Sequence, residues 1–263
     1  MDQKIKFHKY QGAGNDFILI DNRDKVLNNI SNALVKHLCD RRFGIGADGL
    51  MLLQNTNELD FEMVYFNSDG REGSMCGNGG RCIVAFARDL GIIKDKTVFL
   101  AVDGEHYATI QREQVKLGMT DVNEIQKDGE AYVLHTGSPH YVTKANNLTQ
   151  LDVYQQGYAI RNNSTYRQDG INVNFVEKEG AGYFLRTFER GVENETYACG
   201  TGATAVAMAM AIEEDLNGPL EIPIRALGGQ LYVSFEKNGQ RFTNVILKGP
   251  ANFVYEGFIA ISL

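Results

Sequence analysis

The sequence predicts an α+β protein of two related halves, each an antiparallel sheet or barrel wrapped around one central helix. Three observations support this prediction. Many short apolar segments with alternating or β-branched residues are separated by turn signals, as in antiparallel sheets. Two longer segments have the composition of buried helices. Both of these segments begin with a C-G-x-G motif, and the two motifs are separated by about half of the 263-residue chain.

The predicted strands are short and numerous. They cover residues 4–9, 17–21, 60–66, 97–102, 106–111, 131–135, 171–176, 183–188, 230–235 and 243–247. Turn pairs such as Asp103-Gly104 and Asn238-Gly239 separate several of them. Glycine after an acidic or amide residue is a common signal for a tight turn.

Helical signals are fewer. Residues 32–42 follow Ser31, which can act as an N-cap, and residues 149–156 form a weaker helical segment. The two strongest helices start after Cys76 and Cys199, with the sequences NGGRCIVAFARDLG and GTGATAVAMAMAIEEDL. Both are apolar nearly all round, so we expect them to be buried on most of their surface.

The repeated motif predicts two pseudo-symmetric domains. CGNGGRCIVAFARDLG at 76–91 and CGTGATAVAMAMAIEE at 199–214 share a cysteine, two glycines and a following apolar helix. We expect the domains to span 1–116 and 117–253, with residues 254–263 returning as a strand to the first domain. Gly118 and the pair Asp128-Gly129 interrupt the pattern near this boundary.

Composition excludes several classes of protein. The formal net charge is −7 and no dense basic patch is present, so we expect no nucleic-acid partner. No segment approaches the roughly 20 apolar residues of a membrane span, and the N-terminus lacks a signal-peptide core, so we expect a cytoplasmic protein with no membrane partner. The four cysteines form no C-x-x-C pair, which argues against a zinc site.

The positions of Cys76 and Cys199 predict their chemistry. A helix N-terminus exposes unpaired N–H groups and partial positive charge, which stabilise a thiolate and lower its pKa. The glycines that follow let a ligand carboxylate approach these amides. Two such thiols could exchange a proton on opposite faces of the carbon next to that carboxylate, inverting it without a cofactor. Cys39 and Cys82 lack this setting, and we interpret both as structural.

Other cysteine chemistries remain open at this point. Cys76 with His140 could form part of a cysteine-protease site, although that leaves Cys199 unexplained. A disulfide between Cys76 and Cys199 would instead indicate a thiol redox sensor.

Four segments resemble diaminopimelate epimerases. They are FHKYQGAGNDFILID, RRFGIGADGL, FNSDGREGSMCGNGGRC and FERGVENETYACGTGATA, which follow the family's order between residues 7 and 206. The resemblance implies a two-domain fold with an active site in the cleft between the domains, and a homodimer. It also implies catalysis without pyridoxal phosphate, metal or nicotinamide. The implied reaction interconverts LL- and meso-diaminopimelate, on the route to lysine and peptidoglycan precursors.

The resemblance also implies a role for each matching residue. Cys76 and Cys199 match the paired thiol bases, His140 matches a histidine near the first cysteine, and Glu189 matches an acid near the second. The expected substrate-binding residues are Asn15, Asn67, Gly77, Asn78, Ser138, Asn172, Arg190, Gly200 and Thr201. Among them, Arg190 matches the arginine that grips the distal carboxylate, which suits bidentate carboxylate binding.

Two residues depart from the family's pattern. Ser138 stands in Gly137-Ser138-Pro139-His140 where the family commonly has asparagine, and Arg71 stands where a small residue is usual. Two alternatives therefore remain beside diaminopimelate epimerisation. One is a sister racemase acting on proline, hydroxyproline or histidine, and the other is a non-catalytic small-molecule binding protein on the same fold.

Overall fold

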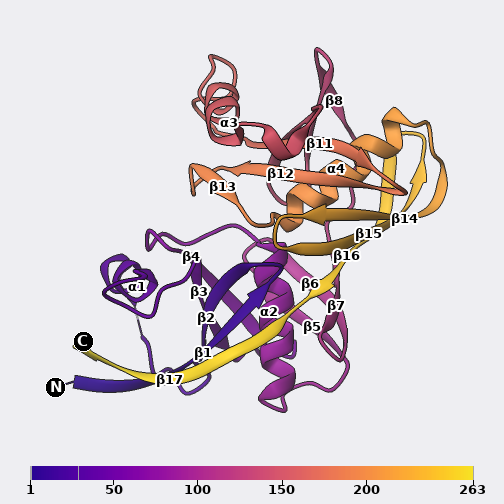
Figure 1. The fold of residues 1–263 in the computed structure, drawn as a ribbon. Coiled ribbons are helices and arrows are strands. Elements are labelled where there is room, and N and C mark those ends of the chain that lie inside the picture. The colour runs from indigo at the N-terminus through magenta and orange to yellow at the C-terminus, as the bar shows by residue number, and fades with distance from the viewer. Residues whose placement is uncertain (1, 29, 263) are drawn as a thin grey trace. The chain divides into compact units, whose positions relative to one another are not determined.

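The structure, a computed structural model, describes residues 2–28 and 30–262. Met1, Asn29 and Leu263, which the predicted domain ranges include, lie outside the described residues. The chain divides into two compact units (Figure 1). Unit 1 contains Met1–Leu117 and Pro250–Leu263, and unit 2 contains Gly118–Gly249. Each unit combines a sheet with helices, which confirms the predicted α+β class.

Unit 1 is built on a mixed sheet in the order β17-β1-β2-β3-β4-β5-β6-β7. The strands are β1 (Asp2–Gly12), β2 (Asn15–Asp21), β3 (Gly49–Gln54), β4 (Glu62–Asn67), β5 (Lys96–Ala101), β6 (Gly104–Gln111), β7 (Gln114–Gly118) and β17 (Asn252–Ser262), and the helices are α1 (Asn32–Cys39) and α2 (Gly77–Asp89).

Unit 2 repeats this plan in the order β8-β9-β10-β11-β12-β14-β15-β16. The strands are β8 (Gln126–Asp128), β9 (Ala131–His135), β10 (Pro139–Lys144), β11 (Asn172–Glu179), β12 (Gly182–Glu189), β13 (Asn194–Thr196), β14 (Gly218–Ala226), β15 (Gly229–Asn238) and β16 (Arg241–Pro250), and the helices are a 3-10 helix (Leu148–Gln150), α3 (Val153–Arg161) and α4 (Gly200–Glu213). Strand β13 pairs with the end of β12.

The sheets are mixed rather than purely antiparallel, unlike the predicted sheets. The parallel pairs are β2–β3 and β4–β5 in unit 1, and β10–β11 and β12–β14 in unit 2. Parallel neighbours need a crossover connection, which is usually a helix. Here α1, α2, α3 and α4 each lie in one of these four connections. The two units therefore share the C-G-x-G motif and also a pair of crossover connections.

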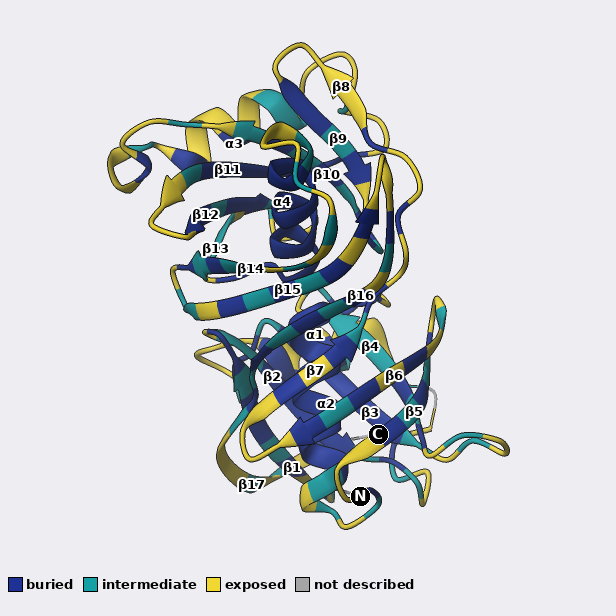
Figure 2. Cartoon of the chain, turned by 90° about the vertical axis from the view of Figure 1, so that its right-hand side faces the viewer, coloured by how far each residue is buried: buried dark blue, intermediate teal, exposed yellow. Residues whose placement is uncertain are grey.

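One helix in each unit is enclosed by strands. Residues 77–87 of α2 and 200–211 of α4 are all buried, as the dark blue α4 shows (Figure 2). Helix α2 contacts β1, β2, β3, β6 and β17, while α4 contacts β9, β10, β11, β12, β14 and β15. The prediction of two central helices that are buried nearly all round is confirmed.

Helices α1 and α3 pack on the other face of the strands that the central helices contact. In unit 1, Val35 and Leu38 of α1 share a core with Ile18 and Ile20 of β2. In unit 2, Val153 of α3 shares a core with alternate residues of β11 and β12, namely Val173, Phe175, Phe184 and Phe188. Because side chains alternate across a strand, the intervening residues of β11 and β12 face α4.

Two predicted helices have different bounds in the structure. Helix α1 stops at Cys39 rather than at residue 42, because Asp40 is extended and its carboxylate accepts from the N–H groups of Arg42 and Phe43. The segment predicted at 149–156 is a 3-10 turn followed by α3, which Asp152 caps by accepting from Gln155 N. No helix in the described part of the chain is both long and apolar enough to cross a membrane.

Candidate active site

Cys76 and Cys199 are the N-caps of the two central helices. Both have extended backbones, with φ −111° and ψ 115° at Cys76 and φ −121° and ψ 112° at Cys199, and the helices begin at the next residue. The predicted helix starts are therefore confirmed. The side chain of Cys76 accepts a hydrogen bond from the first turn of its helix. The N-terminus of a helix stabilises negative charge placed next to it.

The first turn of α2 binds the sulfur of Cys76. The N–H of Gly79 donates to Cys76 Sγ at 3.4 Å. A side chain at position 79 would place its Cβ 1.9 Å from Met51 Cε of β3, so glycine allows this turn to lie against the sheet. The glycine at position 79 thus allows the helix to pack closely on the sheet and leaves the backbone N–H groups at the helix N-terminus uncovered by side chains.

A chain of amides connects Cys76 to buried charges of unit 1. Cys76 Sγ lies 4.0 Å from Asn15 Oδ1, which accepts from Asn78 Nδ2 at 3.1 Å. Asn15 Nδ2 donates to Asp48 Oδ2 at 2.6 Å. At the other end, the buried Arg81 donates to Asn78 Oδ1 at 3.0 Å. These contacts set the orientation of both amides, because Asp48 only accepts and Arg81 only donates.

Asp48 belongs to an ionic cluster beneath Asn15. Arg41 bridges Asp16 and Asp48 at 2.6 and 2.8 Å, and Lys9 pairs with Asp16 at 2.8 Å. Burial alone would raise the pKa of Asp16, but hydrogen bonds from Arg41 and Lys9 lower it to about 2. Burial and the neighbouring Asp16 raise the pKa of Asp48. The cluster holds the start of β2 and the loop that contains Asp48 together.

Asn67 lies at the same edge of the sheet as Asn15. Asn67 ends β4 opposite Gly49, the first residue of β3, and Gly49 pairs with Phe17 of β2. The structure therefore gathers five predicted residues of unit 1 at one sheet edge and the N-terminus of α2. They are Asn15, Asn67, Cys76, Gly77 and Asn78.

In unit 2, the first turn of α4 is joined to the loop before β10. Cys199 Sγ lies 3.4 Å from Thr201 Oγ1, and either atom can be the donor. Thr136 Oγ1 donates to the carbonyl oxygen of Thr201 at 2.8 Å. Cys199, Gly200 and Thr201 are all buried.

The remaining predicted residues lie at one edge of the unit 2 sheet. His140 pairs with Asn172 across the parallel strands β10 and β11, and Val173 pairs with Phe188 one residue before Glu189. Asn172 Nδ2 donates to Ser138 Oγ at 2.8 Å and to the Pro139 carbonyl, and its Oδ1 accepts from Arg190 N at 2.9 Å. Ser138 therefore helps to hold Asn172 in place.

Glu189 and Arg190 follow one another at the end of β12. Glu189 Oε2 accepts from Thr196 Oγ1 at 2.9 Å, and Arg190 Nη1 donates to the carbonyl oxygen of Asp169 at 3.1 Å. The half-buried guanidinium of Arg190 retains further donors that can bind a carboxylate.

His140 is fully buried, and its charge state is set by that burial. Desolvation, with smaller contributions from the charges of His135 and Arg190, lowers the pKa of His140 to about 3. The imidazole is therefore neutral near pH 7. His140 belongs to unit 2, together with Cys199, whereas Cys76 belongs to unit 1.

The other two thiols differ from the helix-capping pair. Burial raises the pKa of Cys39 and of Cys82 to about 12 in each case. Both thiols therefore stay protonated near neutral pH, where a thiol is a poor nucleophile and base. Within the described residues, no group of three or more His, Cys, Asp or Glu side chains could hold a metal ion.

Several neighbours of the predicted residues escaped the sequence analysis. Arg81 and Asp48 contact the amides of unit 1, and Asn174, Thr136 and Thr187 surround the site residues of unit 2. A signal was available for two of them. Asn174 and Thr187 lie two residues from Asn172 and Glu189 along predicted strands, so each shares a face with a predicted site residue.

The chain matches known proteins over nearly its whole length. A sequence profile described as Diaminopimelate epimerase matches residues 7–125 and 132–254. A diaminopimelate epimerase from Flavobacterium psychrophilum is 52% identical over 96% of this chain and 99% of its own, and one from Chlorobaculum tepidum is 40% identical over 95% and 99%.

Solved structures share the fold at low sequence identity. A phenazine biosynthesis protein of the PhzF family from Bacillus anthracis has a TM-score of 0.79 at 15% identity, covering 98% of this chain and 100% of its own. A hydroxyproline epimerase from Agrobacterium vitis has a TM-score of 0.73 at 13% identity, covering 98% and 93%. These likenesses concern the fold alone. The profile match and the full-length identities show that the chain belongs to the diaminopimelate epimerase family.

Proposed function

We propose that this protein interconverts LL- and meso-diaminopimelate by two-base proton exchange at the α-carbon, supplying lysine and peptidoglycan precursor synthesis. The observation that carries the proposal is the pair of cysteines, each the N-cap of a buried central helix in its own unit. Membership of the family and 52% identity to a protein named diaminopimelate epimerase support this substrate.

In the proposed reaction, one thiolate removes the α-proton and becomes a thiol. The electron pair left on the α-carbon is delocalised into the adjacent carboxylate. The other cysteine, present as a thiol, then donates its proton to the opposite face and becomes a thiolate. The configuration is inverted, and the two cysteines have exchanged protonation states, so no redox partner or cofactor is required.

The α-carboxylate is proposed to bind the N–H groups at the start of the two central helices. Gly77 and Asn78 open α2, and Gly200 and Thr201 open α4. Preorganised donors of this kind stabilise the charge that develops on the carboxylate as the proton leaves. The contact from Gly79 N–H to Cys76 Sγ supports the same role for these amides toward a thiolate.

The distal end of the substrate is proposed to bind Arg190 and the asparagines. Arg190 would pair with the distal carboxylate, while Asn15, Asn67 and Asn172 supply neutral donors and acceptors for its ammonium and carboxylate groups. Ser138 is proposed to act through Asn172, because Ser138 Oγ accepts a hydrogen bond from Asn172 Nδ2. His140 and Glu189 are proposed to assist proton transfer at the thiols.

The test follows the α-proton of LL-diaminopimelate in D₂O by ¹H NMR, with reduced protein and no added cofactor. We expect exchange with diaminopimelate and none with proline or histidine. Cys76→Ala and Cys199→Ala should each lower turnover by roughly 10³-fold or more, since each removes a proton-transfer group. Cys39→Ala is the matched control and should retain activity.

Three outcomes of this experiment would contradict the proposal. Exchange with proline or histidine but not with diaminopimelate would move the protein to a sister racemase activity. Full turnover in either helix-cap variant would exclude the two-base mechanism. Absence of exchange with all three substrates would favour a non-catalytic binding protein.

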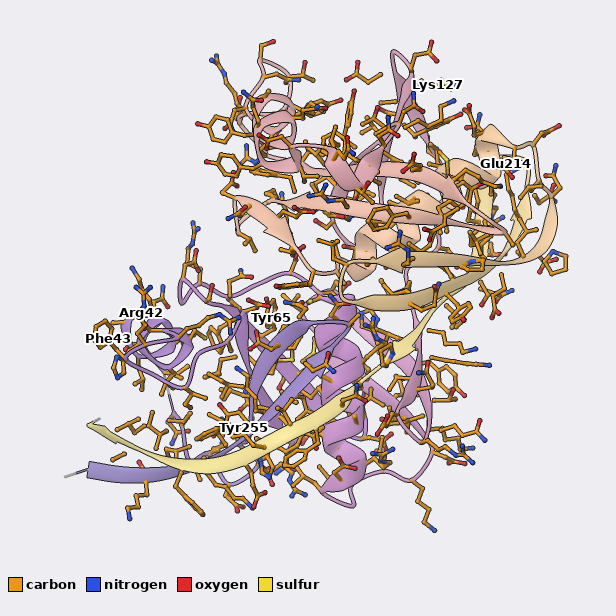
Figure 3. The ribbon with its side chains drawn as sticks, in the orientation of Figure 1. Arg42, Phe43, Tyr65, Lys127, Glu214 and Tyr255 are labelled. Carbon is orange, nitrogen blue, oxygen red and sulfur yellow. The ribbon has the colours of Figure 1, made fainter. Side chains whose placement is uncertain are left out.

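We also propose that the protein is a homodimer that uses the exposed apolar side chains of β17. Phe253, Val254, Tyr255 and Phe258 are large apolar side chains with 43–68% of their surface exposed, and Tyr255 is marked in Figure 3. Exposed large apolar side chains gathered on one strand are typical of an association site. The mechanism needs reduced thiols, which supports a cytoplasmic location.

Light scattering should give twice the chain mass at micromolar concentration, and Phe258→Asp should give the mass of one chain. Phe43 is an exposed aromatic residue of unit 1 outside β17, so Phe43→Asp is the control and should remain a dimer. A monomeric wild-type protein would contradict the proposed association.

A further inference from the structure

A buried polar row lies under the N-terminus of α4 and includes residues that the proposed mechanism does not use. Asn174 and Thr187 are directly opposite each other on β11 and β12, and Asn172 is opposite His140 on β10. By strand alternation these side chains share one face of the sheet. A Cβ at Gly202 would lie 2.4 Å from Asn174 Oδ1 and 3.3 Å from Cys199 Sγ, so the row reaches the first turn of α4.

The hydrogen bonds of Asn174 determine the orientation of its amide. Asn174 Nδ2 lies 3.0 Å from the carbonyl oxygen of Tyr141 and 3.4 Å from that of Asn172. Carbonyl oxygens only accept, so the NH₂ group must face them. On the opposite side, Thr187 Oγ1 donates to Asn174 Oδ1 at 3.0 Å.

The orientation of Asn174 in turn determines the tautomer of His140. Asn174 Nδ2 lies 3.0 Å from His140 Nδ1, so this ring nitrogen must accept a hydrogen bond and carries no proton. A neutral imidazole then has its proton on Nε2. Nε2 is buried and has no hydrogen-bond partner among the residues that the structure describes.

We propose that Asn174 and Thr187 are positioning residues that hold His140 in the Nε2–H tautomer, so that His140 acts in the reaction as a hydrogen-bond donor from Nε2. This inference rests on the proposed role of His140 in proton transfer. It specifies that His140 donates at Nε2 and does not accept there, since Nε2 carries a proton and cannot accept one while Asn174 holds the ring. His140 thus stabilises an anionic reacting group rather than deprotonating a thiol.

Two charged groups act on the ring from neighbouring segments, His135 of β9 and Arg190 after β12, and both oppose its protonation. The hydrogen bond from Asn174 comes from an uncharged amide. Replacing this amide with a carboxylate should therefore change both the tautomer and the pKa of the His140 ring. Asn174→Asp places an acceptor at His140 Nδ1, which favours a proton on Nδ1 and raises the pKa of the ring. In that variant Nε2 no longer donates in the neutral ring.

The first measurement is the ¹⁵N NMR spectrum of protein labelled at its five histidines, without substrate, with His140→Gln to assign the signal. We expect an unprotonated Nδ1 and a protonated Nε2 from pH 5 to pH 9 in the wild type. A proton on Nδ1 would overturn the proposal. Because no substrate is present, this result is independent of whether diaminopimelate is the substrate.

The second measurement uses pairs of variants at Thr187. Thr187→Val removes the hydroxyl that donates to Asn174 Oδ1, whereas Thr187→Ser retains it. We expect Thr187→Val to add an Nδ1–H population to the spectrum and to lower kcat with KM nearly unchanged, and Thr187→Ser to restore both. Asn174→Asp should lower kcat about 100-fold at neutral pH. Lower pH should restore part of this loss, because the protonated ring again carries a proton on Nε2.

A matched control separates positioning from general loss of stability. Thr97 is a buried threonine of unit 1 whose hydroxyl donates to Asp60 at 2.7 Å. Thr97→Val should lower the melting temperature yet leave the His140 signal and the pH profile unchanged. If Thr187→Val changes only the melting temperature, as Thr97→Val does, Asn174 and Thr187 are structural and the proposal is wrong.

Discussion

The four cysteines of this protein lie in different surroundings. Cys39 and Cys82 are buried, and this burial raises the pKa of each thiol to about 12. Cys76 and Cys199 instead lie where two helices present unpaired N–H groups. Helix-start signals around the motif made this distinction predictable from the sequence.

The low pKa of His140 predicts how the stability of the folded protein depends on pH in the acidic range. Its pKa is about 3 in the folded protein, against about 6.5 in an unfolded chain. Between these values the unfolded chain binds a proton that the folded protein does not, so falling pH favours unfolding. Above about pH 6.5 both states are neutral at this residue and its contribution is constant.

We therefore expect urea unfolding of His140→Gln to depend less on pH than that of the wild type. Between about pH 4 and pH 6, the slope of the unfolding free energy should decrease by up to about 1.4 kcal/mol per pH unit. His37→Gln, at an exposed position of α1, should retain the wild-type slope. Equal slopes for the wild type and His140→Gln would show that His140 is protonated in the folded protein.

At the scale of single elements, glycine allows close approach of helices to strands. Gly157 is a buried residue in α3, and a Cβ there would lie 2.3 Å from Phe188 Cβ of β12. The clash involves the Cβ atom of a buried side chain, and this atom cannot move unless β12 moves with it. Helix propensity alone would favour alanine at this position.

Gly157→Ala tests which of these effects is larger. The gain in helix propensity is about 1 kcal/mol, and overpacking a close core contact typically costs about 1–3 kcal/mol. We expect net destabilisation, measured as a lower urea midpoint with an unchanged dependence on urea concentration. Gln156→Ala, at the exposed neighbouring position, is the control and should change stability little. A stabilised Gly157→Ala protein would mean that α3 shifts away from β12.

At the scale of the whole molecule, unit 1 is assembled from both ends of the chain. Strand β17 pairs with β1 along its length, from Asp2–Ser262 to Gln11–Asn252. Ile261 of β17 belongs to the same core as Ile5 and Phe7 of β1. Unit 2 is a continuous segment, Gly118–Gly249, that contains both of its own crossovers.

This chain connectivity predicts different behaviour for two truncated proteins. A fragment of residues 118–249 should fold alone and unfold cooperatively, because its core is formed within the fragment. A chain ending at residue 250 should lose the folding of unit 1, since β1 and α2 lose the strand that covers them. Circular dichroism with thermal unfolding measures both. A truncated chain that keeps two native transitions would show that β17 is dispensable.

Local sequence patterns were sufficient to predict the α+β class, the two buried helices and the helix starts at Cys76 and Cys199. Helix caps, apolar periodicity and the repeated C-G-x-G motif act over a few residues, so they can be read from the chain. The parallel strand pairs, the burial of Arg81 and the contact between Asn174 and His140 required the folded structure. Each of these depends on which strands become neighbours, and Asn174 and His140 are brought together by a crossover that includes α3. The tautomer of His140 is therefore a property of the sheet, which no segment of the sequence specifies alone.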